Sequence, residues 1–121
     1  LFAGARRFGD AVSEQRGERR WVAKEIRRRS SVLTGQTLLM FGYGAIGRRL
    51  TELLAPFGMR LAAVRRTPAG DEPIPMLQGP EVEDALASAD HVVCILPGGA
   101  GTARYFDAAK FSLMKSGARF Y

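Results

Sequence analysis

The sequence contains very little cysteine or histidine and has no long apolar run. Cys94 is the only cysteine and His91 the only histidine, so the chain offers neither an internal disulfide nor a cysteine-based zinc site. No apolar stretch approaches the ~20 residues that span a bilayer, and the N-terminus lacks the pattern of a secretory signal. We therefore expect a soluble, cytoplasmic protein with no metal site and no membrane partner.

Negative charge is scarce only in one part of the chain. The net charge is +6, and residues 1–33 carry nine basic and four acidic side chains, whereas the remaining 88 residues carry nine and eight. A nucleic-acid arm would interleave aromatic side chains with its arginines, and this segment does not, so no nucleic-acid partner is expected. A solvated arginine-rich surface and a subunit-contact arm remain as the two interpretations.

Residues 1–30 are predicted to form a basic helix and a connector. Phe8, Ala11 and Val12 recur at helical spacing, and Gly17 marks a break. A second stretch follows the break, and its apolar side chains are expected to pack against a larger body. These anchors are Trp21, Val22 and Ile26.

From residue 31 the pattern changes to alternating strands and helices, which predicts an α/β dinucleotide-binding domain over residues 31–121 with a Rossmann-type doubly wound parallel sheet. An apolar run at residues 37–41 leads directly into a glycine motif, a helical pattern that ends at Pro56 follows, and a second apolar strand covers residues 59–64. Strand, glycine turn, helix and strand in this order are typical of dinucleotide binding. The motif reads Gly42-Tyr43-Gly44-Ala45-Ile46-Gly47.

Each glycine of the motif has a physical reason in such a unit. Gly42 permits the tight turn, Gly44 lacks the Cβ that would keep a pyrophosphate from the backbone, and Gly47 lets the helix lie close to the strand. The N-terminus of the helix offers unpaired N–H groups to phosphates. The alternative is a glycine turn that only connects a strand to a helix.

The end of the second strand predicts the cofactor. A carboxylate at this position would accept hydrogen bonds from the ribose hydroxyls of NAD, but the chain has Arg65 and Arg66 there. Two guanidinium groups suit a 2′-phosphate, so NADP is preferred and NAD remains possible. The alternative is that one or both arginines point to solvent. Asp71 and Glu72, the next carboxylates, are expected in a loop beyond the ribose.

The second half of the chain continues the alternation. A short helix is predicted over residues 81–89, an apolar strand over residues 91–96, and a helix over residues 107–114 that buries Phe111 and either Leu113 or Met114. The loop at residues 97–102 follows a strand, so it should face the same crevice as the glycine turn.

The lone histidine and the lone cysteine are both interpreted as structural. His91 begins its strand, at the end opposite the crevice, and Cys94 lies in the middle of the same strand as a small hydrophobic side chain.

The whole set of motifs resembles the D-isomer-specific 2-hydroxyacid dehydrogenases, with glyoxylate/hydroxypyruvate reductases closest in character. The resemblance covers nearly the whole chain, more loosely before residue 31, and order and spacing make it far more specific than the glycine motif alone. It rests on Leu33-Thr34-Gly35-Gln36-Thr37, the glycine motif with Arg48, Ala89-Asp90-His91-Val92-Val93, Leu96-Pro97, Thr102, and Leu113-Met114-Lys115-Ser116-Gly117-Ala118.

The resemblance implies a dimeric two-domain enzyme that interconverts 2-oxo acids and D-2-hydroxy acids with NAD(P)H. It assigns backbone N–H groups of Ala45 and Ile46 to the pyrophosphate. It also implies that the N-terminal segment helps to form the dimer contact. The adenosine ribose would be surrounded by Arg65, Arg66 and Thr67, and the nicotinamide side approached by Leu96, Pro97 and Thr102.

One departure from the family pattern limits the activity that we expect of this chain. The family's substrate-binding arginine and its glutamate–histidine acid/base pair come later than Tyr121, so no catalytic residue is assigned within these 121 residues. We expect an incomplete domain from a longer chain, inactive by itself. A non-enzymatic nucleotide sensor or corepressor-like protein on the same fold is the alternative function.

Overall fold

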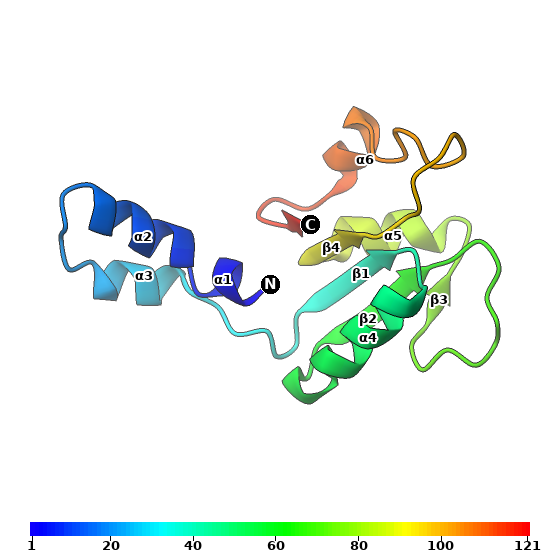
Figure 1. Cartoon of the computed structure of the whole chain (residues 1–121), viewed down its shortest axis with the longest axis horizontal. Coiled ribbons are helices and arrows are strands. Elements are labelled where there is room, and N and C mark those ends of the chain that lie inside the picture. Colours follow the sequence, from blue (N-terminus) through cyan, green and yellow to red (C-terminus); the bar gives the residue numbers. More distant parts are fainter. The chain divides into compact units, whose positions relative to one another are not determined.

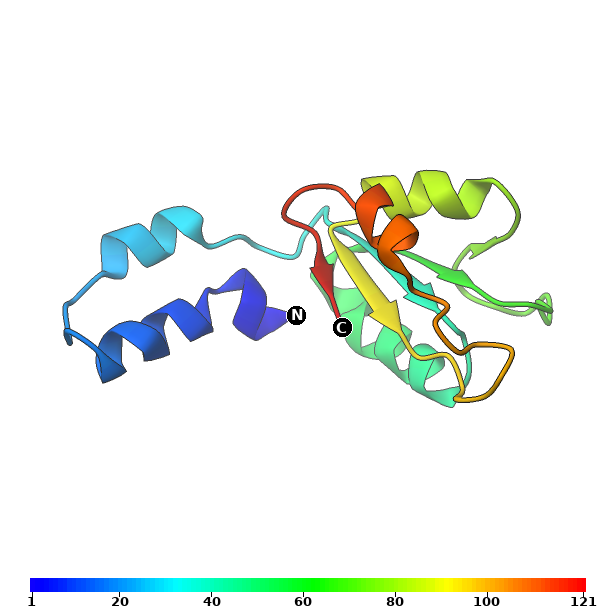
Figure 2. The ribbon, with the colours of Figure 1, turned by 90° about the horizontal axis from the view of Figure 1, so that it is seen from above.

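The computed structural model describes residues 1–121, which fold as two compact units. The first unit comprises Leu1–Thr34 and the second Gly35–Tyr121. None of the helices combines the length and the apolar content needed to cross a membrane. Figures 1 and 2 show both units, which are described separately below.

The first unit is helical. It contains the short helix α1 (Phe2–Ala5) and the pair α2 (Phe8–Arg16) and α3 (Ala23–Arg29), shown in blue and cyan in Figure 1. Helix α2 ends at Gly17, as the sequence predicted, and the chain then returns as α3. Trp21 is 87% exposed, so its side chain does not pack within this unit, and the expected packing against a larger body stays a prediction.

The second unit is a five-stranded, all-parallel sheet with helices on both faces, which confirms the predicted fold class. The strands lie in the order β3-β2-β1-β4-β5, so the order reverses between β1 and β4. Ligands bind at such a reversal in open parallel sheets, outside the carboxyl ends of the strands. The strands are β1 (Thr37–Phe41), β2 (Arg60–Val64), β3 (Met76–Leu77), β4 (His91–Cys94) and β5 (Arg119–Phe120).

Helices cover the two faces of this sheet unequally. Figure 2 shows α4 (Ala45–Leu54) on one face and both α5 (Glu81–Ser88) and α6 (Ala108–Leu113) on the other. A short 3-10 turn, η1 (Ala55–Phe57), ends α4, and Gly58 beyond it has a left-handed backbone. The helical connection through α4 and those through α5 and α6 therefore pass on opposite faces of the sheet, as in a doubly wound sheet.

Strand β1 forms the centre of the core because it is buried on both faces. Leu39 and Phe41 point towards α5, where they pack with Leu86 and Val92, all at most 1% exposed. Successive side chains of a strand point to opposite faces of the sheet, so Leu38 and Met40 face α4. The core therefore holds the carboxyl end of β1, where the glycine motif begins, in a fixed position.

Helix α6 differs from its prediction. Phe111 and Leu113 are 45% and 41% exposed, so only the alternative Met114 packs against the core. Phe111 nevertheless joins an aromatic cluster with Phe106 and Phe120, at ring-centroid distances of 5.6 and 5.0 Å. With only six residues, α6 is held by these aromatic edges rather than by a buried stripe.

Candidate functional site

The glycine turn is held between the ends of two strands. Gly42 follows β1 with φ of +100°, and a Cβ at this position would lie 2.8 Å from the carbonyl oxygen of Ile95. Its N–H donates to the carbonyl of Val64 at 2.9 Å, at the end of β2. No other residue fits both the backbone angle and the space, so glycine here fixes the turn at the reversal of strand order.

Gly44 presents open space rather than a packed neighbour. It is the N-cap of α4, has an extended backbone, and a Cβ built on it meets no atom within 4 Å. The helix has no side-chain cap, and its first backbone hydrogen bond runs from the N–H of Arg48 to the carbonyl of Gly44 at 3.0 Å. The N–H groups of Ala45, Ile46 and Gly47 therefore face this space and suit an anion.

Gly47 is instead required for the close packing of α4 against its neighbours. A Cβ there would lie 3.0 Å from the ring of Tyr43 and 3.4 Å from Ile95. The hydroxyl of Tyr43 and the carbonyl of Gly47 both hydrogen-bond to the buried Thr51, at 3.4 and 3.0 Å. This small network seats the first turn of α4 against the glycine turn and fixes the direction of the helix N-terminus.

The end of β2 brings the two arginines to the same edge, but their surroundings differ. Arg66 and Thr67 are exposed and Arg65 is half-buried. A guanidinium N–H of Arg65 donates to Glu72 at 2.9 Å, and the Glu72 side chain is only 3% exposed. The loop thus returns Glu72 to the end of β2, in direct contact with Arg65, the side chain expected to face the ribose.

Glu72 is held by more than this ion pair. Its carboxylate also accepts hydrogen bonds from the backbone N–H groups of Ala69 at 2.7 Å and Gly70 at 2.8 Å. These N–H groups, together with the Arg65 guanidinium, hold the pKa of the Glu72 carboxyl below its ordinary value despite its burial. Glu72 is therefore ionised at neutral pH.

A second ion pair ties the same loop to the glycine helix. Arg48 in α4 lies 3.2 Å from Asp71, and its guanidinium sits over the ring of Tyr43 at 5.8 Å from the centroid. The loop between β2 and β3 is thereby anchored beside the N-terminal half of α4. Both acidic residues of this loop are engaged by arginines that flank the predicted cofactor site.

The loop after β4 forms the other side of the crevice. The N–H of Ile95 donates to the carbonyl of Phe41 at 2.9 Å, so this loop starts directly beside the glycine turn. Leu96 packs against the core, while the Thr102 hydroxyl donates to the carbonyl of Pro97. The structure thus brings the glycine turn, the arginine pair and residues 96–102 to one edge of the sheet.

His91 lies at the start of β4, away from this edge, and Cys94 is a half-buried free cysteine at the end of the same strand. His91 is fully buried at the start of β4; its Nε2–H donates to the Gln36 side chain at 2.6 Å, and Nδ1 accepts from the Tyr121 hydroxyl at 3.3 Å. Burial, with a smaller contribution from nearby Arg119, lowers the pKa of His91 to about 4. A neutral imidazole between two fixed partners has a structural role. No three His, Cys, Asp or Glu side chains converge as a metal site.

Sequence reasoning missed Glu72 and Asp71 as parts of the site. The available signal was the pair Pro68 and Gly70, which are typical of a turn that reverses the chain. Gly70 has φ of +88°, and this reversal carries Glu72 back to Arg65. Hydrophobic periodicity does not show in which direction a loop carries the chain, so the contact between Glu72 and Arg65 was not predicted.

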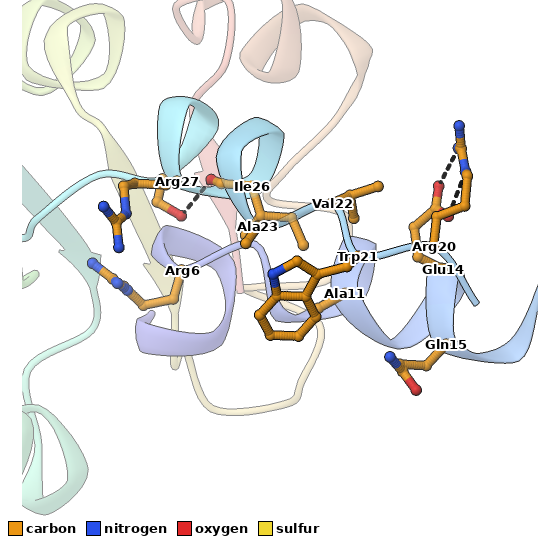
Figure 3. Close-up of a pocket in the computed structure, with 11 residues that line it drawn as sticks. Arg6, Ala11, Glu14, Gln15, Arg20, Trp21, Val22, Ala23, Ile26 and Arg27 are labelled. Atoms are coloured by element: carbon orange, nitrogen blue, oxygen red, sulfur yellow. Dashed lines mark hydrogen bonds and ion pairs between the residues drawn. The ribbon is translucent and has the colours of Figure 1, made fainter. Parts of the chain in front are cut away.

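The helical unit has a hollow of its own. Its volume is about 350 Å³, and it lies between α2 and α3. Figure 3 shows the Trp21 indole beside Ala11, and the ion pair of Arg20 with Glu14 at 2.9 Å lies at one end. The other lining residues include Val22, which precedes α3, and Ala23 and Ile26 within it. The lining combines these apolar side chains with the charged side chains of Arg6, Glu14, Arg20 and Arg27.

The chain matches one known protein family over its whole length. The family model described as "D-isomer specific 2-hydroxyacid dehydrogenase, NAD binding domain" matches residues 1–121. No curated sequence matches the chain.

Solved structures are similar over almost the whole chain. The TT0316 protein of Thermus thermophilus is 30% identical with a TM-score of 0.84, over 99% of this chain and 37% of that one. Phosphoglycerate dehydrogenase of Lactobacillus plantarum is 30% identical with a TM-score of 0.82, over 98% and 37%. An NAD complex of formate dehydrogenase from Staphylococcus aureus, 23% identical with a TM-score of 0.84 over 99% and 36%, shares the fold. The chain thus spans somewhat more than a third of the length of these structures.

Proposed function

Because the chain belongs to the D-isomer specific 2-hydroxyacid dehydrogenase family, as its NAD-binding domain, we propose that it binds the nucleotide for hydride transfer between NADPH and a 2-oxo acid/D-2-hydroxy acid pair. The oxo acid we propose is of the glyoxylate or hydroxypyruvate type. The observation that carries the nucleotide proposal is the turn at Gly42 and Gly44, where one glycine is locked between strands and the next opens onto free space.

The residues present fit a dinucleotide along this edge. Gly42, Gly44 and Gly47 shape the turn, and the N–H groups of Ala45 and Ile46 would hold the pyrophosphate at the start of α4. The nicotinamide ring supplies the hydride when bound. At its end of the crevice we propose contacts from Leu96, Pro97 and Thr102, which the loop hydrogen bonds hold in place.

Selectivity for NADPH is assigned to the end of β2. Arg66 and Thr67 are exposed there, Arg65 lies beside them, and residues 64–70 contain no acidic side chain. A guanidinium and a 2′-phosphate form charge-assisted hydrogen bonds that contribute roughly 1.5–3 kcal/mol each, which corresponds to about tenfold or more in affinity. No group in this chain is assigned to proton transfer.

The experiment is a fluorescence titration of the full-length protein with NADPH and with NADH. We expect tighter NADPH binding, and Arg66→Gln should weaken NADPH about tenfold while sparing NADH. A double variant, Arg65→Asp with Arg66→Ala, should remove the preference altogether. Equal affinities in the unaltered protein would refute the NADP preference, and absence of binding of either nucleotide would refute the function.

The helical unit is proposed to form part of a homodimer contact in the cytoplasm. The supporting observation is the 87% exposure of Trp21, which lines the hollow together with apolar residues such as Ala11 (Figure 3). A solvated tryptophan on such a surface is costly and is typical of interfaces. The free thiol of Cys94, the chain's one cysteine, fits a reducing compartment.

A further inference from the structure

Glu72 occupies a set of donors that an anion would otherwise use. Its carboxylate receives the Arg65 guanidinium at 2.9 Å and two backbone N–H groups at 2.7 and 2.8 Å, and it is 3% exposed. These three donors come from one short loop at the end of β2. A cation with two convergent N–H groups is the arrangement that binds phosphate in proteins.

One of these occupied donors, the Arg65 guanidinium, is the side chain that the proposed function assigns to the ribose. Arg65 directly follows Val64, whose carbonyl accepts the N–H of Gly42, so Arg65 lies at the nucleotide edge of the sheet. Its charge is already compensated by a carboxylate in direct contact. A 2′-phosphate that approached Arg65 would meet this negative charge a few ångströms away, and like charges at that distance repel.

Arg66 has different surroundings. It is exposed, forms none of the chain's ion pairs, and precedes the loop that carries Glu72. The two arginines therefore cannot contribute equally to recognition of a phosphate. The contribution of Arg65 depends on whether Glu72 remains in place.

We propose that Glu72 is a specificity-determining residue: by occupying Arg65 and the N–H groups of Ala69 and Gly70, it lowers the affinity of the site for nucleotides that carry a 2′-phosphate. The inference rests on the proposed nucleotide function. It adds that the preference for NADPH over NADH is weaker than two unpaired arginines would produce. It also makes Arg66 the main phosphate contact in the unaltered protein.

The test uses two ligands that differ only in the 2′-phosphate, adenosine 5′-monophosphate and adenosine 2′,5′-bisphosphate. Their dissociation constants are measured by calorimetry on the full-length protein and on Glu72→Gln. The glutamine amide oxygen can still accept from one of the two loop N–H groups, so the loop keeps part of its anchoring while Arg65 loses its counter-charge. We expect the bisphosphate to bind roughly tenfold more tightly and the monophosphate to change less than about twofold.

Asp71→Asn is the matched control, because it removes the same charge one residue earlier. Asp71 is 68% exposed and pairs with Arg48 in α4 rather than with Arg65. Both ligands carry a 5′-phosphate near α4, so any effect of releasing Arg48 acts on both alike. The ratio of the two dissociation constants should therefore stay within about twofold of the unaltered protein.

A second variant keeps the inference testable if Glu72→Gln fails to fold. Arg65→Gln leaves the Glu72 carboxylate without its counter-charge at the ribose edge. The bisphosphate should then bind roughly tenfold more weakly, with the monophosphate unchanged. An unchanged bisphosphate affinity in this variant would place the Arg65–Glu72 pair away from the ribose and overturn the inference.

The outcomes separate this inference from the function on which it rests. If both adenosine ligands bind and Glu72→Gln leaves their ratio unchanged, the role of Glu72 is wrong and nucleotide binding stands. Suppose the unaltered protein prefers NADH but Glu72→Gln still raises the affinity for the bisphosphate relative to the monophosphate. The proposed NADP preference is then refuted, and the role of Glu72 stands. If no adenosine nucleotide binds any variant, both are refuted.

Discussion

Two glycines of one turn have opposite relations to their surroundings, which makes them separable by mutation. Gly42→Ala forces a Cβ to within 2.8 Å of the Ile95 backbone at a positive φ, so we expect a loss of about 3 kcal/mol in the free energy of unfolding. Gly44→Ala meets nothing within 4 Å and has φ of −105°, so it should cost less than about 1 kcal/mol.

Nucleotide affinity should respond strongly to the substitution that costs the least stability, Gly44→Ala. Gly44→Ala should retain its fold but bind NADH at least about tenfold more weakly, since the added methyl fills the space before the helix N-terminus. Urea unfolding and nucleotide titration measure the two effects. Unchanged nucleotide affinity in Gly44→Ala would show that the open space is not the pyrophosphate site.

His91 predicts a specific pH dependence of stability. Its pKa falls from 6.5 to about 4 on folding, mainly because burial disfavours the charged ring. Below pH 6.5 the unfolded chain therefore takes up a proton that the folded chain does not, and stability decreases as the pH falls. We expect a loss of about 3 kcal/mol between pH 7 and pH 4 that His91→Asn lacks, measured by urea unfolding at both values. Parallel curves for the two proteins would contradict this.

At the scale of elements, α5 is held to the sheet by one fully buried leucine. Leu86 is 1% exposed and packs with Leu39 and Phe41 of β1. Leu86→Ala should lower the free energy of unfolding by about 3 kcal/mol through lost burial and a cavity. Leu53→Ala in α4 is the control, because Leu53 is 53% exposed and should cost below about 1 kcal/mol. Equal effects in chemical denaturation would contradict the assignment of the core.

Sequence patterns predicted the elements whose side chains face both layers of the core. The run at residues 37–41 became β1 with the same bounds, because a strand buried on both faces must be apolar throughout. Strand β4 ends at Cys94 rather than at Leu96, since Ile95 and Leu96 already turn into the loop at the crevice. Strands β3 and β5 have two residues each, too few to show an alternation of apolar and polar side chains. They form strands because they pair with β2 and β4.

The candidate site was predictable where backbone geometry demands a residue type, and less so where side chains meet across a loop. Gly42 and Gly47 were assigned correctly as turn and packing glycines, because a Cβ at either would be crowded by its neighbours. The engagement of Arg65 by Glu72 depends on a left-handed Gly70 and three hydrogen bonds, none of which follows from periodicity.

At the scale of the whole molecule, the excess positive charge and the exposed tryptophan belong to the same helical unit. If this unit forms the homodimer contact, Trp21→Ser should shift the full-length protein from dimer to monomer in sedimentation at micromolar concentration, because a central aromatic residue carries much of an interface's energy. Phe57→Ser, a 38% exposed residue of the sheet unit, serves as the control. An unaltered dimer in Trp21→Ser would exclude this surface.

The loop from β2 to β3 has a consequence for how selectivity can change during evolution or engineering. The Glu72 carboxylate reaches Arg65 only because six residues lie between them and the chain reverses at Gly70. Insertion or deletion of a single residue in this exposed stretch would displace the carboxylate without altering any side chain of the sheet core. If Glu72 has the proposed role, nucleotide choice would change with loop length while the sheet and its glycine turn stay intact.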